Sequence, residues 1–302
     1  MDVTDVYINR PGELWFETQG GSIERVDAPE LDTALLTRLA RQVAALSGQG
    51  INFESPLLAA ALPSGERIQV AIPPATRGEV AMAIRKHAVS ALELEDYQRP
   101  SGKLAQQDIG RRPEQNDCEP VRLSSDADVL REAVRNRSNI LVSGGTSSGK
   151  TTFLNSLLRE VPSHERLILI EDAPELKVAQ PNWVGLVASR GLAGQAALSA
   201  EDLLIAALRM RPDRIILGEI RGSEATTFLR AINTGHPGSL STIHADSPLR
   251  AIDQLALLVL QTGMRMNWDD VVTYVRQSID LIVQLTRVGG RREIAAMYRV
   301  ER

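Results

Sequence analysis

Hydrophobic and polar residues alternate in short runs along the first part of the chain, and this pattern predicts strands. Residues 3–26 alternate around the turn sequences RPGE and QGG, which indicates a hairpin or meander. Two further strands are predicted by RIQVAI (67–72), which ends at Pro73-Pro74, and by EVAMAIRKH (79–87). We therefore expect this part of the chain to form a small mixed sheet with helices.

A helical repeat lies between these strands, over residues 31–46. Its apolar residues at helical spacing are Leu31, Leu35, Leu39, Val43 and Leu46. Ser47-Gly48 ends the run, as expected at the end of a helix. This face of the helix is expected to pack against the sheet.

Residues 99–121 interrupt the pattern, because apolar residues become sparse and Pro, Gly, Gln and charged residues dominate. Such a segment is typical of a linker between domains. The sequence therefore predicts an N-terminal α+β domain over 1–98, a linker over 99–121 and a larger domain over 122–302.

The pattern in the larger domain changes to alternating strands and helices. The expected strands are 139–144, 166–172, 213–220 and 238–245, and the expected helices are one from about 150 and others near 199–211, 223–234, 249–262 and 268–279. Residues 282–300 predict a closing hairpin that turns at Gly289-Gly290. Almost continuous apolar strands between amphipathic helices are typical of a mostly parallel sheet covered on both faces, so the fold class is α/β.

Composition excludes several classes of protein. The chain has 34 Lys and Arg against 38 Asp and Glu, so a dedicated or sequence-specific nucleic-acid binder is not expected. Its single cysteine, Cys118, cannot form an internal disulfide and leaves no Cys/His spacing for a structural zinc. No apolar run approaches the roughly 20 residues of a membrane span, so we expect a cytoplasmic protein that can still dock on a membrane partner.

The sequence VSGGTSSGKTTFLN contains a phosphate-binding pattern between a predicted strand and a predicted helix. Its backbone N–H groups and the helix N-terminus suit the phosphates of ATP, Lys150 suits the β- and γ-phosphates, and the Thr151 hydroxyl suits Mg²⁺. The residues expected to bind the nucleotide are Gly144, Gly145, Thr146, Ser147, Ser148, Gly149, Lys150, Thr151 and Thr152. The alternative is a Gly- and Ser-rich turn before an ordinary helix.

Acidic side chains follow two of the predicted buried strands. Glu219 lies near the end of DRIILGEI, and Glu171 and Asp172 end RLILIED. A carboxylate near the γ-phosphate can orient water and help to hold the metal, so Glu219 is a candidate for both tasks. We expect its strand to lie beside the strand that leads into the phosphate loop. The alternative for each carboxylate is a solvated residue at the end of a strand.

Two histidines flank the last predicted strand of the parallel sheet, His236 before it and His244 at its end. A lone histidine is more often structural than catalytic, and no suitable third ligand supports metal binding. His244 could instead contact the γ-phosphate or its attacking water and report hydrolysis to the sheet.

Four segments together carry a resemblance to a known family. GGTSSGKTTFLNSLL, ILIEDAPEL, LRMRPDRIILGEIRGSEA and GHPGSLSTIHADSP resemble, in this order, the Walker A, Asp, Walker B and His boxes of the secretion ATPase superfamily. They look most like the VirB-type traffic ATPases of type IV secretion and conjugation systems. The resemblance implies a RecA-like ATPase domain, ATP and Mg²⁺ near the cleft between two domains, a hexameric ring, and peripheral association with secretion-channel components at the inner membrane.

The resemblance also implies roles for single residues. Glu219 matches the Walker B glutamate, Glu171 the Asp-box glutamate and His244 the His-box histidine, while Lys150 and Thr151 match the Walker A lysine and threonine. Ser148 stands where many relatives have glycine, a mild departure.

Three arginines have competing interpretations. Arg211 matches a phosphate-side arginine of the family, and Arg67 and Arg85 match paired arginines of the N-terminal domain that approach the phosphates. The alternatives are a surface arginine at a helix C-terminus for Arg211 and two solvated strand residues for Arg67 and Arg85.

The expected function is ATP hydrolysis that powers assembly of, or export through, a type IV secretion apparatus. A pilus-assembly or type II secretion motor is the nearest rival function, although the tetracysteine zinc insert common there cannot form with one cysteine. A nucleotide-gated structural ring without turnover is a second rival. A DNA helicase is a third, and the acidic balance of charge disfavours it.

Overall fold

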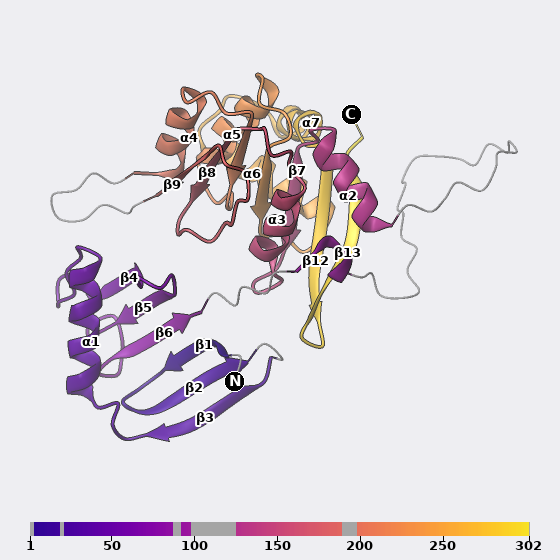
Figure 1. Ribbon diagram of the computed structural model, residues 1–302. Coiled ribbons are helices and arrows are strands. Elements are labelled where there is room, and N and C mark those ends of the chain that lie inside the picture. Colours follow the sequence, from indigo (N-terminus) through magenta and orange to yellow (C-terminus); the bar gives the residue numbers. More distant parts are fainter. Residues whose placement is uncertain (1–2, 19–20, 87–91, 98–124, 189–197, 302) are drawn as a thin grey trace, which may run out of the picture.

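The computed structural model describes residues 3–18, 21–86, 92–97, 125–188 and 198–301. The expected linker at 99–121, including Cys118, lies outside the described residues. Two separate sheets organise the chain, one on each side of that segment (Figure 1).

The N-terminal sheet has six strands in the order β3-β2-β1-β6-β5-β4. The strands are β1 (Val3–Ile8), β2 (Gly12–Thr18), β3 (Ile23–Ala28), β4 (Leu57–Ala61), β5 (Arg67–Ala71) and β6 (Ala81–Arg85). Every pairing is antiparallel, so the expectation of a mixed sheet is wrong. Four of these pairs are formed by neighbours in the chain: β1–β2, β2–β3 and β4–β5 have short connections, β5–β6 has a longer one, and each connection returns the chain antiparallel to the strand before it.

Helix α1 (Thr33–Leu46) packs on this sheet in the position that the helical repeat predicts. Its buried side chains, however, are those of Leu36, Ala40, Val43 and Ala44, whereas Leu46 is 71% exposed. The two alanines at the centre of the contact allow the helix backbone to approach the strands. Of the predicted leucines, Leu31 and Leu39 pack partly buried beside this contact, so leucine spacing alone places the buried face to one side of its centre.

The C-terminal sheet has seven strands in the order β13-β12-β7-β11-β10-β8-β9. The strands are β7 (Ile140–Gly144), β8 (Leu167–Glu171), β9 (Trp183–Val187), β10 (Arg214–Leu217), β11 (Leu240–Ile243), β12 (Leu281–Val288) and β13 (Arg291–Arg299). Among the described strands of this sheet, only β12 and β13 pair antiparallel, which confirms a mostly parallel sheet and the closing hairpin. Strand β11 lies between β7 and β10, so the expected direct neighbourhood of the Glu219 strand and the phosphate-loop strand is wrong.

Helices cover both faces of this sheet. They are α2 (Asp126–Arg135), α3 (Lys150–Arg159), α4 (Ala200–Leu208), α5 (Glu224–Asn233), α6 (Pro248–Gln261) and α7 (Trp268–Ser278), and a short 3-10 helix η1 (Leu94–Asp96) precedes them. Alternate residues of β8 separate the two cores. Ile168 and Ile170 pack toward α4 to α7, and Leu167 and Leu169 pack toward α2 and α3. Each fully buried leucine contributes about 1.5–3 kcal/mol, so this sandwich is the main stabilising layer.

Three of these elements are not among those expected in the sequence analysis. Strand β4 is short and alanine-rich, and β9 is an edge strand whose Trp183 and Val187 remain exposed. Helix α2 begins at a capping box in which the Ser125 and Asp128 side chains bond each other's backbone N–H groups. Its buried residues, Ala127, Leu130 and Val134, stand at helical spacing, so the helix carries an amphipathic signal that the sequence analysis did not use.

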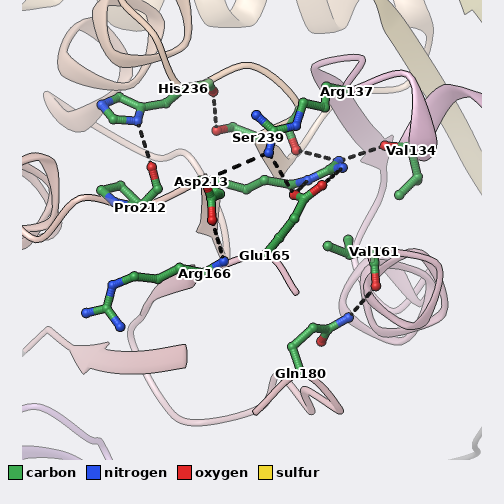
Figure 2. A network of polar contacts seen from close by, with 12 residues as sticks. Val134, Arg137, Val161, Glu165, Arg166, Gln180, Pro212, Asp213, His236 and Ser239 are labelled. Atoms are coloured by element: carbon green, nitrogen blue, oxygen red, sulfur yellow. Dashed lines mark hydrogen bonds and ion pairs between the residues drawn. The ribbon is translucent and has the colours of Figure 1, made fainter. Parts of the chain in front are cut away.

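A buried ion pair joins the amino ends of the parallel strands. The Arg214 guanidinium is fully buried and donates to both carboxylate oxygens of Glu165, at 2.5 and 3.0 Å. It also donates to the carbonyl oxygens of Val134 in α2, at 2.8 Å, and of Gly238 before β11, at 3.3 Å. Figure 2 shows Glu165 in this network, with Val134 and Arg137 beside it.

Gly238 is required for this arrangement. Its φ of +79° is unfavourable for other residues, and an added Cβ would lie 2.7 Å from Nη1 of Arg214. The buried guanidinium of Arg214 therefore holds helix α2 and strands β8, β10 and β11 together.

Replacing Arg214 with methionine tests this clamp. Because Arg214→Met removes the buried partner of the Glu165 carboxylate and leaves it, among the described residues, only the contact with Arg137 at 3.5 Å, we expect the free energy of unfolding to fall by about 3–5 kcal/mol. Urea denaturation measures the change, and Arg209→Met, at an exposed position that ends α4, is the matched control. A loss equal to that of the control would contradict a clamping role.

Candidate functional site

The phosphate loop connects the carboxyl end of β7 to the first turn of α3. Gly149 is the N-cap of α3 and has φ +91°, a left-handed conformation that favours glycine. Ser148, the departure from the family pattern, donates its hydroxyl to the carbonyl oxygen of Gly145 at 2.9 Å. The substitution thus adds a bond inside the loop, and the first-turn N–H groups of α3 remain available to an anion.

Lys150 lies at the centre of the loop. Its Nζ donates to the carbonyl oxygens of Gly144 and Gly145, at 2.9 and 3.1 Å, and lies 3.3 Å from Nδ1 of His244. Burial lowers the pKa of this ammonium to about 8, although the nearby Glu219 carboxylate favours the charged form. An anionic phosphate would replace these carbonyl contacts and restore the charge.

Glu219 follows β10 and is held by an arginine two residues later. Arg221 donates to Glu219 Oε2 at 2.8 Å and to Asp172 Oδ2 at 3.2 Å, so it joins the ends of two strands. Burial opposes ionisation of Glu219, but the Arg221 hydrogen bond and the nearby cations outweigh it and lower its pKa. The carboxylate is therefore charged at neutral pH.

His244 follows β11 directly, and its Nε2 lies 3.1 Å from Oε1 of Glu219. Burial and the neighbouring Lys150 lower the pKa of the imidazole, so the neutral form is favoured despite the carboxylate. His236, at the other end of the strand, lies near the carbonyl oxygen of Pro212, at 3.1 Å from Nδ1 (Figure 2). The two histidines that flank β11 thus have separate surroundings.

Glu171 ends β8 and shapes the loop that follows. One carboxylate oxygen accepts the backbone N–H groups of Glu175 and Leu176, both at 2.7 Å. Burial raises the pKa of Glu171 even though these two hydrogen bonds favour the charged form. In this conformation Glu171 holds the loop that presents Glu175.

The two arginines predicted in the N-terminal domain lie directly opposite each other in the pairing of β5 with β6. Arg67 forms an ion pair with Glu175 at 2.5 Å, and Arg85 lies 4.0 Å from Asp5. Like charges in a cross-strand pair repel, so this arrangement costs stability unless anions lie close by.

A single cavity of about 820 Å³ collects most of these groups. Its lining includes Lys150, Thr151, Glu171, Glu219, His244, Arg67 and Arg85. Both sheets contribute to it, which gives a cleft between the two parts of the chain.

Arg211 does not join the cavity that the described residues form. It is exposed, has φ +53°, and lies three residues before β10 begins, whereas the cavity lies at the carboxyl ends of the strands. The predicted phosphate-side position for Arg211 is therefore not found in this chain, since the arginine and Glu219 lie at opposite ends of one strand.

The sequence analysis misses several cationic residues of the cavity lining, and two of these, Arg221 and Arg292, contact other groups of the site. Arg221 follows Glu219 by two residues, and this spacing could have indicated it. Arg292 lies in the closing hairpin, far along the chain from the phosphate loop, and carries no local signal.

The chemistry of the cavity fits a magnesium ion. Glu219 Oε1 is buried and, although the His244 ring lies near it, accepts no hydrogen bond among the described residues, as expected for an oxygen that a cation or its water would satisfy. Thr151 lines the same cavity with a hydroxyl oxygen. Hydroxyl and carboxylate oxygens are the donors that Mg²⁺ prefers.

Comparison with known proteins gives consistent results. The family model described as "Type II/IV secretion system protein" matches residues 2–292. The chain is 37% identical to the type IV secretion system protein VirB11 of Bartonella henselae, over 97% of this chain and 87% of that protein. It is 38% identical to the type IV secretion system protein PtlH of Bordetella pertussis, over 99% of this chain and 91% of that protein.

Two solved structures are also similar. One is the VirB11 ATPase of the Brucella suis type IV secretion system in complex with sulphate, with 35% identity, a TM-score of 0.53 and coverage of 99% of this chain and 92% of that one. The other is the pilus retraction motor PilT with bound ADP, with 22% identity, a TM-score of 0.63 and coverage of 99% and 80%. The second likeness shows the fold alone.

The pKa of Lys150 predicts a pH dependence of phosphate binding. Lys150 is charged below about pH 8 and neutral above it, and phosphate favours the charged form. Affinity for ADP should thus fall by about tenfold between about pH 7 and about pH 9.

Isothermal titration across this range measures the effect. The matched control is Lys150→Arg, because the guanidinium remains charged at about pH 9 and should remove the pH dependence even if binding is weaker. A flat profile for the unmodified chain would show that Lys150 is charged throughout.

Proposed function

We propose that this chain hydrolyses ATP in the cleft between its two sheets to drive assembly of a secretion apparatus or export through it. The chain belongs to the type II/IV secretion system protein family and is an ATPase of type IV secretion. The observation that carries the proposal is the convergence of the phosphate loop, Glu219 and His244 with Arg67 and Arg85 in one cavity. The two sheets support a division into domains at 1–98 and 122–302, joined by 99–121.

The residues of the C-terminal sheet supply binding and general base chemistry. The backbone N–H groups from Gly144 to Thr152 surround the phosphates, and the Lys150 ammonium moves from its carbonyl partners to the β- and γ-phosphates. The ionised Glu219 orients water for attack on the γ-phosphate, and Arg221 keeps one of its oxygens fixed while the other faces the cavity.

His244 contributes as a neutral ring between Lys150 and Glu219, 3.3 Å from the Lys150 ammonium and 3.1 Å from Glu219 Oε1. Its ring can contact the γ-phosphate or the attacking water, so its position depends on whether the phosphate is present. Because His244 directly follows β11, a change in the position of its ring reaches the centre of the sheet.

Thr151 and Glu219 are the residues that would hold Mg²⁺. When bound, the ion neutralises charge that develops on the β- and γ-phosphate oxygens. The unsatisfied Oε1 of Glu219 supports this assignment.

Arg67 and Arg85 complete the site from the N-terminal sheet. They lie near Glu175 and Asp5, so the γ-phosphate must compete with carboxylates for them. Their transfer to the phosphate would draw the two sheets together and make hydrolysis depend on closure. The contact between Glu175 and Arg67 also links this step to the loop that Glu171 holds.

The assembled form is a homo-oligomer, which we propose to be a hexameric ring on the cytoplasmic side of the inner membrane, docked on channel components. Exposed apolar side chains on the ATPase domain, among them Trp183, Ile205 and Leu257, suit subunit contacts. Within the described part of the chain, no helix combines the length and apolar character needed to cross a bilayer. Membrane association would therefore depend on partners.

Glu219→Gln tests the proposed chemistry. The amide keeps the size of the side chain but cannot act as a base, so we expect ATP to remain bound while turnover falls by about a hundredfold or more. Phosphate release, ATP affinity and substrate transfer through the apparatus are measured for the same variant. Glu132→Gln, at an exposed position of α2, is the control. Loss of binding in proportion to turnover would assign Glu219 to folding or metal binding instead.

Arg67→Ala and Arg85→Ala test the contribution of the N-terminal domain. Each should lower turnover by about tenfold to a hundredfold, because a cation for the developing phosphate charge is lost. ATPase rates are compared with those of Arg38→Ala, an exposed position on α1 of the same domain. A sizing column establishes that the assembly is unchanged, and normal rates in the double variant would remove both arginines from the mechanism.

A further inference from the structure

The closing hairpin lies against the phosphate loop. Strand β12 pairs with β7 so that Leu285 lies opposite Gly144, and it then continues past the end of β7. The hairpin turns and returns as β13, which places Arg292 directly opposite Arg287. In Figure 1 this yellow hairpin reaches beyond the sheet toward the N-terminal strands, and Arg287 there forms an ion pair with Glu17 at 3.4 Å.

Arg292 is in direct contact with the phosphate loop. Its Nη1 donates to the hydroxyl oxygen of Thr152 in the first turn of α3, at 3.0 Å. Its aliphatic part crosses Gly149 so closely that an added Cβ would lie 2.4 Å from Cδ and 2.7 Å from Nε. Gly149 therefore serves both the left-handed turn and the passage of this arginine.

The charges around Arg292 favour an anion. Burial lowers its pKa, and the nearby Arg287 and Arg85 guanidinium groups lower it further. The cross-strand pair of Arg287 with Arg292 repels, and a second such pair, Arg67 with Arg85, lines the same cavity. Carboxylates near Arg287, Arg67 and Arg85 relieve part of this repulsion, and a multiply charged anion in the cavity would offset the rest.

We propose that Arg292 binds the phosphates that ATP and ADP share, from the side of the nucleotide opposite to the hydrolytic groups. Lys150, Glu219 and His244 contact one another around the end of β11, whereas Arg292 reaches Thr152, two residues further into α3. A guanidinium over the first turn of this helix adds its charge to the N–H groups there. The inference rests on the proposed function, because it takes this cavity as the nucleotide site.

Arg292→Gln separates this contact from the catalytic ones. Because the arginine would contact phosphates present in both nucleotides, affinity for ATP and for ADP should fall by the same factor, about tenfold. KM should rise by a similar factor while kcat stays within about twofold, since the contact is equal in ground and transition states. Arg292→Lys should recover part of the affinity, because it keeps the charge without the planar fork.

Arg299→Gln is the matched control, an exposed arginine at the other end of β13 and outside the cavity lining. Thermal unfolding of each variant without added nucleotide shows whether the hairpin remains folded. If Arg292→Gln unfolds, Arg292→Lys carries the test, with a loss of affinity smaller than tenfold but equal for ATP and ADP.

Three results would overturn the inference. They are affinities equal to those of Arg299→Gln, a loss for ATP without a loss for ADP, and a fall in kcat at unchanged affinity. With each of these three results the unmodified chain still binds nucleotide, so the proposed function stands. An unmodified chain that binds neither ATP nor ADP would contradict the proposed function itself, and the inference with it.

Discussion

The buried pair of Arg214 and Glu165 lies where the parallel strands begin, and the geometry of the site depends on it. Strands β8, β10 and β11 are only four or five residues long, so a shift of their amino ends also moves their carboxyl ends. Glu171, Glu219 and His244 stand at those other ends. The ion pair fixes the amino ends through contacts with α2 and the segment before β11, and therefore sets where these three side chains meet. Removing either Arg214 or Glu165 would leave the charge of the other one buried, which is strongly destabilising.

At the carboxyl ends of the parallel strands, the cations of the site have acceptors within the protein. Lys150 uses loop carbonyls, Arg221 uses Glu219 and Asp172, and Arg67 uses Glu175. Nucleotide binding is therefore an exchange of partners rather than the filling of a positive pocket. The lowered pKa values of Lys150 and His244 limit the charge that the cavity holds before the anion arrives. Arg67 comes from the other sheet, so in the proposed mechanism the same exchange couples nucleotide binding to the position of the N-terminal domain.

The sequence by itself determined the features that short stretches of backbone carry. The phosphate loop is contiguous, and its glycines, lysine and hydroxyls act within one turn of structure, so Gly144 to Thr152 could be identified directly. Apolar strands alternating with amphipathic helices predict the parallel sheet, because side-chain periodicity follows from local geometry. The strand ends that carry Glu171, Glu219 and His244 follow from the same pattern, and the resemblance to secretion ATPases adds Arg67 and Arg85.

Only the tertiary structure decided which distant residues meet. Strand order is set by long-range pairing, which inserts β11 between β7 and β10 and places Arg211 at the edge of the sheet away from the cavity. The cross-strand pair of Arg67 with Arg85 depends on a register that no short window contains, and although the hairpin turn brings Arg287 and Arg292 together, its sequence does not show that they reach the cavity. Arg292 reaches the phosphate loop because β12, near the end of the C-terminal domain, pairs with β7, near its start. Local propensity specifies a helix or strand, but the pairing of strands in the sheet decides which side chains it buries and which charged groups lie beside it.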